Sequence, residues 1–543
     1  MTVYINGVAQ VGGAAIVPAT KVIVAVDAVD TTRADYVSDG ANDEADFQQF
    51  ITDVGATGGL LECSEGTFVW GAATLTLASK LTFRGRGMGV TTLKLANGLA
   101  VNMLTVDTKA DITFMDMTFD GNLAGVATGK ILYAKDVTHL RFERCRFQNV
   151  NNASALDFWN GPCPNVEFID CEFLTCEGRA LDFDAAGSME WLKVIGCRFK
   201  DIKHYAVMAA NVNLPSAQII DNMCMNIGAT GYAAMYITLD HDTHVKGNII
   251  VSCTREGFDI RGTIASGLFE GNSVYMPGRD GIKIDGTRFS IIGNYVYATP
   301  AFYSGIIVKT TAYLLTINDN MVRLCQDNGI TVEANCLFLD ISHNTLIDNG
   351  QRANNVHTDI QLKNPVTDSR ICDNTIRATL ANKTKYGIEE QAGCDRNVIK
   401  GNIISGTQTS ALLIVGSEDA FDHCIMTDEL DLSGAGADTA AYHAATHGQL
   451  VGYTIFYTEL SSADAGVDIR IGRYQDGVAL DDDYFDVTVS EVSQALGYAT
   501  FIATAALTQI TLAKGDTVTV GTPGGKTGTG KVRLVLYIAD MAD

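Results

Sequence analysis

Residues 268–286, LFEGNSVYMPGRDGIKIDG, contain one full unit of the pattern that decides the fold. The alternation that begins at Phe269 predicts one strand, and GIKID predicts a second. Gly, Asn and Asp, which favour turns, bound both strands. The centre of the unit, Asn272, recurs in equivalent segments at Met117, Cys145, Cys171, Cys197, Asn222, Asn248, Asn294, Asn320, Asn344, Asn374 and Asn402.

These centres follow one another at intervals of 22 to 30 residues, a repeat length typical of solenoid proteins. Such a repeat is too short for a propeller blade of four full strands, but it fits one coil of a parallel β-helix with short strands on each side. Equivalent residues of successive coils then lie about 4.8 Å apart, the spacing of neighbouring strands. The sequence therefore predicts an all-β protein built around a parallel β-helix.

The column of asparagines supports this fold. A side-chain amide in the column can donate to the coil on one side and accept from the coil on the other. A buried amide without such a partner would cost about 1–3 kcal/mol. In the earlier coils Cys145, Cys171 and Cys197 take the same position, where a small apolar side chain also fits. A metal or disulfide role for these cysteines is the alternative, and simple burial is favoured because the position points inward.

The composition argues against several classes of protein. A net charge of −24 disfavours nucleic acid as a partner, because phosphate binding needs a basic face. It also makes a highly anionic polymer a less natural ligand, unless a local basic groove or a metal ion exists. No apolar run approaches the length of a membrane span, and the N-terminus MTVYINGVAQ lacks the features of a signal peptide. The odd count of 13 cysteines favours free thiols and folding in a reducing compartment.

The pattern divides the chain into three parts. Residues 1–34 are apolar and rich in Gly and Ala, and we expect an attachment or leader segment there. The β-helix is expected over 35–425, where Asn42 or Asp43 can cap a short amphipathic helix that covers the open end of the first coil. Beyond the last repeat, longer strands predict a C-terminal antiparallel β-sandwich over 426–543.

The second strand of each coil carries the candidate functional surface, because its third and fifth positions face outward. Carboxylates on adjacent rungs raise one another's pKa, so one can act as an acid while another acts as a base or nucleophile, as glycoside hydrolysis requires. A flat indole face can in addition support a sugar ring. The first candidate cluster has Asp157, Asp182 and Asp184 as catalytic residues and Trp159, Glu177 and Arg179 as substrate-binding residues.

A second candidate cluster lies near the middle of the solenoid. Its catalytic candidates are Asp259 and Asp285, its substrate-binding candidates are Arg261 and Lys283, and Glu256 and Asp280 occupy the turns before them. Both clusters also have a structural interpretation, because outward strand positions in any solenoid are polar. The second cluster can consist of surface ion pairs worth less than about 1 kcal/mol each. A site formed between subunits is a third possibility.

No metal or cofactor is predicted. The side chains of Asp240, His241, Asp242 and His244 could bind a metal, but a solvated loop is favoured there. His443 and His447 are spaced for a metal on a helix, and packing between chains explains them equally well. Ca²⁺ could bind the run Asp481, Asp482 and Asp483, where an acidic turn is the default interpretation.

The segments DYVSDGANDEADFQQFI, GGLLECSEGTFVW and LTLASKLTFRGRGMGVTTLKL, followed by the Asn-centred coils, resemble pectate-lyase-like right-handed β-helix proteins of bacteriophage tails. The resemblance covers residues 35–425. It implies a homotrimeric tailspike that folds in the host cytoplasm, joins the phage tail or baseplate through its N-terminal segment, and depolymerises a bacterial surface polysaccharide outside the cell. The C-terminal strands look like small jelly-roll domains that close such trimers or bind glycans. The polygalacturonase pairs (Asn-x-Asp, Asp-Asp, His-Gly, Arg-x-Lys) do not occur in order, so that particular chemistry is not carried over.

Three functions follow from these residues. Glycoside hydrolysis by paired carboxylates is favoured. A polysaccharide lyase is an alternative, in which Arg261 and Lys283 would neutralise charge beside a base. A glycan-binding adhesin or tail fibre without catalysis is the other alternative. Two carboxylates that converge in a groove would favour an enzyme, and scattered acids on a flat face would favour binding alone.

Overall fold

The structure is a computed structural model. It describes residues 19–413 except 29–31, 33, 72, 126–128, 152–153, 160, 186, 210–211, 229–230, 239–240, 263–266, 310 and 408, and the side chains of 184, 185 and 410. Before residue 19 and after residue 413 it describes the backbone of strands alone. The chain divides into two units, residues 1–254 and 255–543.

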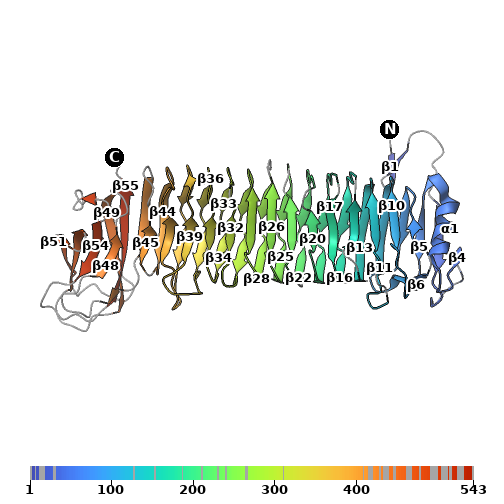
Figure 1. Cartoon of the computed structure of the whole chain (residues 1–543), viewed down its shortest axis with the longest axis horizontal. Helices are drawn as coiled ribbons and strands as arrows, with labels where there is room; N and C mark the ends of the chain where they lie inside the picture. Colours follow the sequence, from blue (N-terminus) through green and yellow to red (C-terminus); the bar gives the residue numbers. More distant parts are fainter. Residues whose placement is uncertain are drawn as a thin grey trace. The chain divides into compact units, whose positions relative to one another are not determined.

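The first unit contains stacked coils whose strands form three parallel sheets in its described part (Figure 1). One sheet contains the predicted outward-facing strands, in the order β7 (Leu75–Thr76), β10 (Leu104–Asp107), β12 (Leu132–Lys135), β14 (Ser154–Trp159), β17 (Arg179–Ala185), β20 (Val207–Ala209) and β23 (Met235–Thr238). The other two sheets share the long strands β11 (Ala110–Asp120) and β13 (Thr138–Val150). One of them continues through β15 (Val166–Ile169), β18 (Lys193–Ile195), β21 (Gln218–Ile220) and β24 (His244–Lys246). The other continues through β16 (Glu172–Cys176), β19 (Arg198–Ile202), β22 (Met223–Ile227) and β25 (Ile249–Cys253). The predicted parallel solenoid is therefore confirmed.

The second unit repeats this arrangement. Its outward-facing sheet runs β26 (Phe258–Gly262), β29 (Ile282–Gly286), β32 (Ile306–Val308), β35 (Ile330–Val332), β39 (Thr358–Leu362), β43 (Tyr386–Glu390) and β45 (Ser410–Leu413). The other two sheets run β27 (Leu268–Glu270), β30 (Ser290–Ile292), β33 (Thr316–Asn318), β37 (Asp340–Ser342), β41 (Arg370–Cys372) and β44 (Val398–Ser405), and β28 (Ser273–Pro277), β31 (Tyr295–Tyr297), β34 (Met321–Arg323), β38 (Thr345–Ile347), β42 (Thr375–Arg377) and the end of β44.

One detail of the coil differs from the sequence prediction. The alternation after Phe269 predicted a single strand, but the chain forms β27 and β28 with a corner between them. Gly271 stands at the corner with φ +61°, a left-handed conformation that glycine adopts without steric cost. Asn272 follows and turns its side chain into the core, so each coil has three strands in place of two.

The asparagine column forms the predicted ladder. In the second unit the Nδ2 of each asparagine donates to the Oδ1 of the next, from Asn272 to Asn294 at 3.0 Å and from Asn374 to Asn402 at 2.9 Å. The backbone N–H groups donate to the same oxygens, for example from Asn294 to Asn320 at 2.9 Å. In the first unit the cysteines of the column are buried, and the 12 described cysteines of the chain are free thiols.

Apolar side chains stack in the same way along the core of the first unit. The rings of Phe114, Phe142 and Phe168 lie nearly parallel, with centroids 5.2 Å and 5.4 Å apart. Equivalent positions in successive coils thus hold the same residue type because they share one environment. Each full burial of such a side chain contributes about 1.5–3 kcal/mol.

Helix α1 (Glu44–Val54) stands at the beginning of the described coils. Phe47 lies 5.4 Å from Phe68 and Phe50 lies 5.8 Å from Phe83, measured between ring centroids. Asp43 precedes the helix but its side chain does not cap it, because the residue already has helical dihedral angles. Its carboxylate instead accepts the N–H groups of Gly40 and Val69, at 2.9 Å and 2.6 Å.

The strands after Ala420 pair mainly antiparallel, as expected for the C-terminal segment. The sheet β48–β54–β50–β51 contains Thr439–His443, Asp516–Gly521, Val467–Gln475 and Val478–Val489. The strand β55 (Lys531–Asp540) pairs with β46 (Ala420–Met426), β47 (Leu430–Asp431) and β49 (Gly448–Glu459), and β49 also pairs with β52 (Ala499–Ile502) and β53 (Thr511–Leu512). The sandwich and the boundaries at residues 35 and 426 stay predictions.

Candidate functional site

The first predicted cluster is brought together only in part. Asp157 of β14 and Asp182 of β17 are register partners on adjacent rungs, as the alignment of coils predicted. Both are buried, and each has a basic partner: Lys130 contacts Asp157, and Arg179 Nη1 donates to both Asp182 oxygens at 2.8–2.9 Å. Burial raises the pKa of Asp157, and the ion pair with Lys130 opposes this rise.

The other members of this cluster point elsewhere or lie outside the description. Trp159 is 44% exposed, beyond a register shift at the end of β14. Glu177 forms an ion pair with Lys203, and both line a separate pocket of about 350 Å³. The side chain of Asp184 is outside the described residues. The three described carboxylates of the cluster, Asp157, Glu177 and Asp182, therefore each have a basic partner.

The second predicted cluster forms a network of ion pairs across β26 and β29. Asp259 faces Lys283 in the register, and Arg261 faces Asp285. Lys283 Nζ donates to Asp259 Oδ2 at 2.9 Å, while Arg261 Nε lies 3.6 Å from Asp259 and 4.0 Å from Asp285. Lys283 also borders a larger pocket, which the other three do not line.

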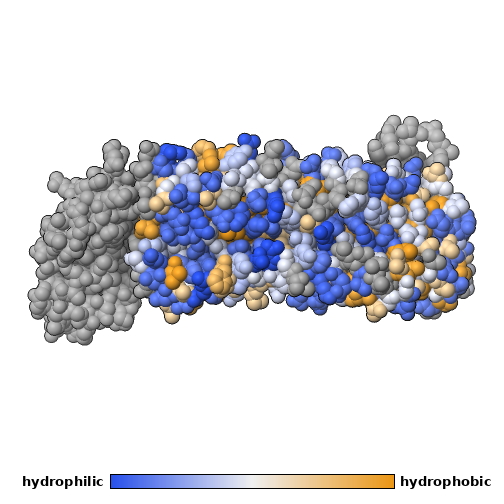
Figure 2. Space-filling model, viewed as in Figure 1, coloured by the Kyte–Doolittle hydropathy of each residue, from blue (hydrophilic) through white to orange (hydrophobic). Residues whose placement is uncertain are grey.

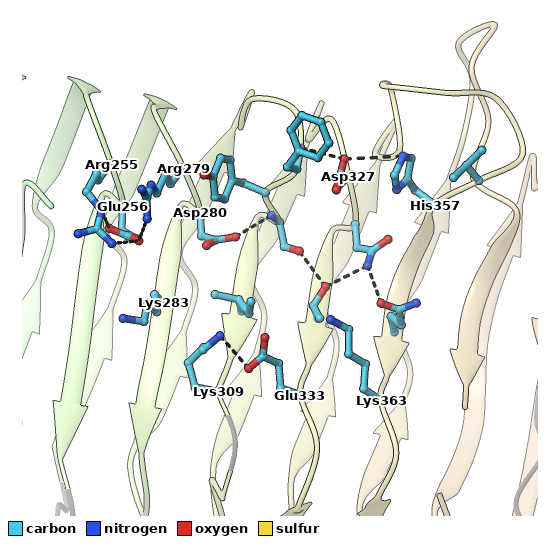
Figure 3. A pocket seen from close by; sticks show the side chains of 18 residues that line it. Arg255, Glu256, Arg279, Asp280, Lys283, Lys309, Asp327, Glu333, His357 and Lys363 are labelled. Atoms are coloured by element: carbon cyan, nitrogen blue, oxygen red, sulfur yellow. Dashed lines mark hydrogen bonds and ion pairs between the residues drawn. The ribbon is translucent and has the colours of Figure 1, made fainter. Parts of the chain in front are cut away.

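This pocket, of about 570 Å³, lies within the second unit (Figure 3). Five successive coils contribute to it, from the turns before β26, β29, β32, β35 and β39 and from the outward faces of the last four of these strands. The lining includes five basic residues, Arg255, Arg279, Lys283, Lys309 and Lys363, and four acidic residues, Glu256, Asp280, Asp327 and Glu333. The basic and acidic side chains of the pocket are therefore nearly balanced in charge, on a chain that is acidic overall. On the face that Figure 2 shows, hydrophilic residues predominate over these coils.

Two carboxylates of the pocket occupy equivalent positions on neighbouring coils. Glu256 and Asp280 each precede the glycine that begins the outward strand, and the N–H of Gly257 donates to the carbonyl of Asp280. Equivalent positions lie about 4.8 Å apart along the stack. The two side chains are therefore close enough for one charge to act on the other, and both are buried.

The surroundings of the two carboxylates differ. Burial raises the pKa of Asp280 to about 6; the Ser304 N–H, which donates to Asp280 at 2.7 Å, opposes this rise, and the charge of Glu256 adds to it. Glu256 has two guanidinium partners, with Arg255 Nε at 3.1 Å and Arg279 Nη1 at 3.9 Å. Asp280 is thus a carboxyl that can hold a proton near neutral pH, beside a carboxylate whose charge is compensated (Figure 3).

The wall beyond Asp280 is ordered by hydrogen bonds between coils. Ser304 Oγ lies 2.8 Å from Thr331 Oγ1, and Asn328 Nδ2 donates to Thr331 Oγ1 and to Gln361 Oε1 at 3.0 Å each. Lys309 and Glu333 form an ion pair at 2.7 Å. The pocket therefore has a polar, fixed wall with groups that can donate to hydroxyl oxygens.

Glu256 and Asp280 were expected in the turns beside the second cluster, with no role assigned to them. The signal that could have found them is the repeated Arg-acid-Gly of Arg255–Gly257 and Arg279–Gly281, one coil apart. Among the described residues no group of three or more His, Cys, Asp and Glu side chains is arranged to hold a metal. The helices that the structure describes include none long and apolar enough to cross a membrane. Asp240 and the side chains of His443, His447 and Asp481–Asp483 lie outside the described residues.

Comparison with known proteins agrees with this fold. The family model named "Right handed beta helix region" matches residues 187–359, so this region is a right-handed β-helix. A search of curated proteins by sequence finds no match. A mutant tailspike protein of E. coli bacteriophage HK620, solved in complex with a pentasaccharide, is similar in structure, with TM-score 0.51 and 14% identity over 94% of this chain and 92% of that chain.

Two further structures are similar at lower TM-score. The A-module of a mannuronan C-5 epimerase from Azotobacter vinelandii has TM-score 0.40 and 17% identity, over 70% of this chain and 95% of that chain. Tailspike protein 3 of bacteriophage CBA120 has TM-score 0.40 and 12% identity, over 70% of this chain and 60% of that chain. At 14% identity the similarity to the HK620 structure establishes the fold alone.

Proposed function

We propose that this protein is a phage tailspike that depolymerises a bacterial surface polysaccharide, and that the pocket around Glu256 and Asp280 hydrolyses the glycosidic bond. The observation that carries the proposal is the pair of buried carboxylates on adjacent coils, in unlike surroundings, at the wall of a pocket of about 570 Å³. The tailspike fold of the HK620 protein, which was solved with a pentasaccharide, supports the choice of substrate class.

The roles follow from the surroundings. Asp280, whose pKa is about 6, donates its proton to the glycosidic oxygen as the bond to the anomeric carbon breaks. The Glu256 carboxylate stabilises the positive charge that develops on the sugar, either by attacking the anomeric carbon or by taking a proton from the attacking water. Water supplies the hydroxyl group of the new reducing end. If Glu256 attacks the anomeric carbon, the other proton of this water returns to Asp280; if Glu256 acts as the base, it takes that proton and releases it to solvent, while Asp280 regains a proton from solvent.

A lyase is the second candidate, because five basic side chains line the pocket. In that case a cation such as Lys363 would neutralise the carboxylate of a uronic acid, and a base would remove the proton beside it. Hydrolysis and elimination give different products. An unsaturated sugar with a new ultraviolet absorbance would identify the lyase, and a saturated reducing end would identify the hydrolase.

The predicted cluster at Asp157 and Asp182 is the competing location for the active site. Its ion pairs with Lys130 and Arg179 leave each carboxylate compensated, whereas Asp280 lacks a basic partner within ion-pair distance among the described residues. A pure adhesin function would use the same pocket without proton transfer. We further propose a homotrimer attached to the phage tail through residues 1–34, with α1 closing the first coil and residues 426–543 as a β-sandwich.

The test is release of reducing ends from a panel of purified capsular and O-antigen polysaccharides. Asp280→Asn and Glu256→Gln should each lower the rate by about 10²–10⁴-fold, the range that general acid–base groups contribute. Asp182→Asn and the exposed Asp285→Asn are matched controls and should keep most of the activity. Loss of activity in Asp182→Asn alone would move the active site to the first cluster, and binding without cleavage by the unmodified protein would leave an adhesin.

A further inference from the structure

The rim of the pocket carries an aromatic side chain that the proposed chemistry does not use. Phe302 is 74% exposed, and it lies in the turn before β32 with φ +74°. A bulky residue in this left-handed conformation is uncommon. Single exposed apolar residues are normal on protein surfaces, so exposure alone assigns no role to this ring.

Phe302 differs from a single exposed apolar residue because charged side chains contact both its backbone and its ring. Asp327 Oδ1, one coil further on, accepts the backbone N–H of Phe302 at 3.1 Å. The guanidinium of Arg352 lies 4.2 Å from the centre of the ring and 3.5 Å from Asp327 Oδ1. His357 Nε2 lies 3.7 Å from the same oxygen (Figure 3). Arg352 therefore packs on one side of the exposed ring, and Asp327 contacts both Arg352 and the backbone of Phe302.

Arg352, which packs on the ring, comes from the longest coil. The interval from Asn344 to Asn374 is 30 residues, at the upper end of the 22–30 found in this chain. The additional length forms residues 350–357, here named the rim loop, which contributes Val356 and His357 to the pocket. The insertion and the exposed ring thus meet at the same pocket.

The rim loop is fixed on both sides. The backbone N–H of Arg352 donates to Gln326 O at 2.8 Å in the preceding coil. Gln351 exchanges two hydrogen bonds with Asn382 of the following coil, at 2.7 Å and 2.9 Å. Arg352 is therefore presented to Phe302 by a loop that is hydrogen-bonded to the coils on both sides. A ring that is positioned before a ligand arrives loses less entropy on binding.

We propose that Phe302 is a sugar-binding platform of this pocket, on whose open face one ring of the polysaccharide stacks, and that the rim loop positions it through Arg352 and Asp327. A pyranose has a face of C–H groups that is apolar enough to lie on an aromatic ring, while its hydroxyl groups remain at the edge for the polar wall. The inference rests on the proposed function, since it assigns a subsite of the same pocket.

The experiment measures binding of the Asp280→Asn protein to an immobilised panel of purified capsular and O-antigen polysaccharides, with and without a second substitution. Phe302→Ala should weaken binding at least about tenfold, which corresponds to about 1.4 kcal/mol, without lowering the melting temperature, because the ring is exposed. Phe302→Trp should retain binding. Phe338→Ala is the matched control, since Phe338 is 50% exposed, has φ +55° and lies outside the pocket.

The role of Arg352 is tested by non-additivity. If Arg352 acts through the ring, Arg352→Ala should weaken binding by a smaller factor, and it should have no further effect once Phe302 is alanine. Equal binding by the Phe302→Ala and Phe338→Ala proteins would refute the platform while leaving hydrolysis untouched. Loss of binding in Phe302→Ala, together with no cleavage by the unmodified protein, would keep the platform and remove the enzyme. A panel to which no protein binds would overturn both proposals.

Discussion

Replacing Asp280 by asparagine should stabilise the protein at neutral pH while it removes activity. The carboxyl has a pKa of about 6 in the folded protein, against an ordinary value of 3.8. Because each unit of pKa difference corresponds to about 1.36 kcal/mol, burial of the charged form lowers the free energy of unfolding by about 3 kcal/mol. An amide of the same shape avoids this penalty and can still accept the N–H of Ser304.

The sign of the pH dependence follows from the direction of the shift. Below pH 3.8 the carboxyl is protonated in both folded and unfolded chains, so aspartic acid and asparagine should be equivalent there. As the pH rises from 3.8 to about 6 the unfolded chain loses the proton first, and the stability of the unmodified protein falls relative to that of Asp280→Asn. Above about pH 6 the difference should be constant and at its largest.

The assay is urea unfolding of both proteins at a series of pH values between 4 and 8. Asp285→Asn is the control, because that side chain is 44% exposed and water already solvates its charge. A gain for Asp280→Asn that grows with pH would support the buried, proton-holding carboxyl on which the proposed acid role depends. A difference that does not change with pH, or an asparagine variant that is less stable at pH 8, would refute the reasoning.

Two further changes test the solenoid itself. Asn320→Ala should lower the free energy of unfolding by about 2–6 kcal/mol, because the Nδ2 and the backbone N–H of Asn294 would both lose their acceptor, at about 1–3 kcal/mol each. Urea unfolding measures this change, and a loss below about 1 kcal/mol would contradict the ladder. Asp359 is buried between Asn349 and Thr384, and burial raises its pKa to about 7. The coil should therefore lose stability as the pH rises from 4 to 8, and its backbone amides should exchange faster than those of the Asp359→Asn protein. Identical pH profiles of the two proteins, after correction for intrinsic exchange, would contradict this.

The sequence predicted the solenoid well because stacking places the same residue in the same environment many times. One asparagine indicates little, but six of them from Asn272 to Asn402, one in each coil, can form a continuous ladder at the strand spacing. The corner at Gly271 was missed because the inward phase shifts by one residue there, from Phe269 to Asn272 and Val274, and this shift is easily taken for one continuous strand. The inward Asn272 and the outward residues around it look like one strand until the backbone is seen.

The site was harder to predict because its chemistry depends on burial by other coils. Position three of the outward strands holds Asp157, Asp182 and Asp259, which the sequence singles out, yet each of them has a basic partner close by. The repeat pattern of the sequence does not predict that Lys130 and Arg179 are those partners. The number of acidic residues in a column is therefore a weaker guide to catalysis than the charges that neighbouring coils bring to them.

Asp280 shows the opposite case. In its column the next two coils hold Ser304 and Asn328, neutral residues that donate hydrogen bonds, and the preceding coil holds Glu256. Asp280 has no ion-pair partner among the described residues, and the charge of Lys309 opposes the effect of burial only in part, so burial and the like charge of Glu256 raise its pKa. A repeat protein can thus create a reactive group where a column of acidic residues ends. Here the column ends at Ser304, and the coil that contains the rim loop lies two coils beyond Ser304.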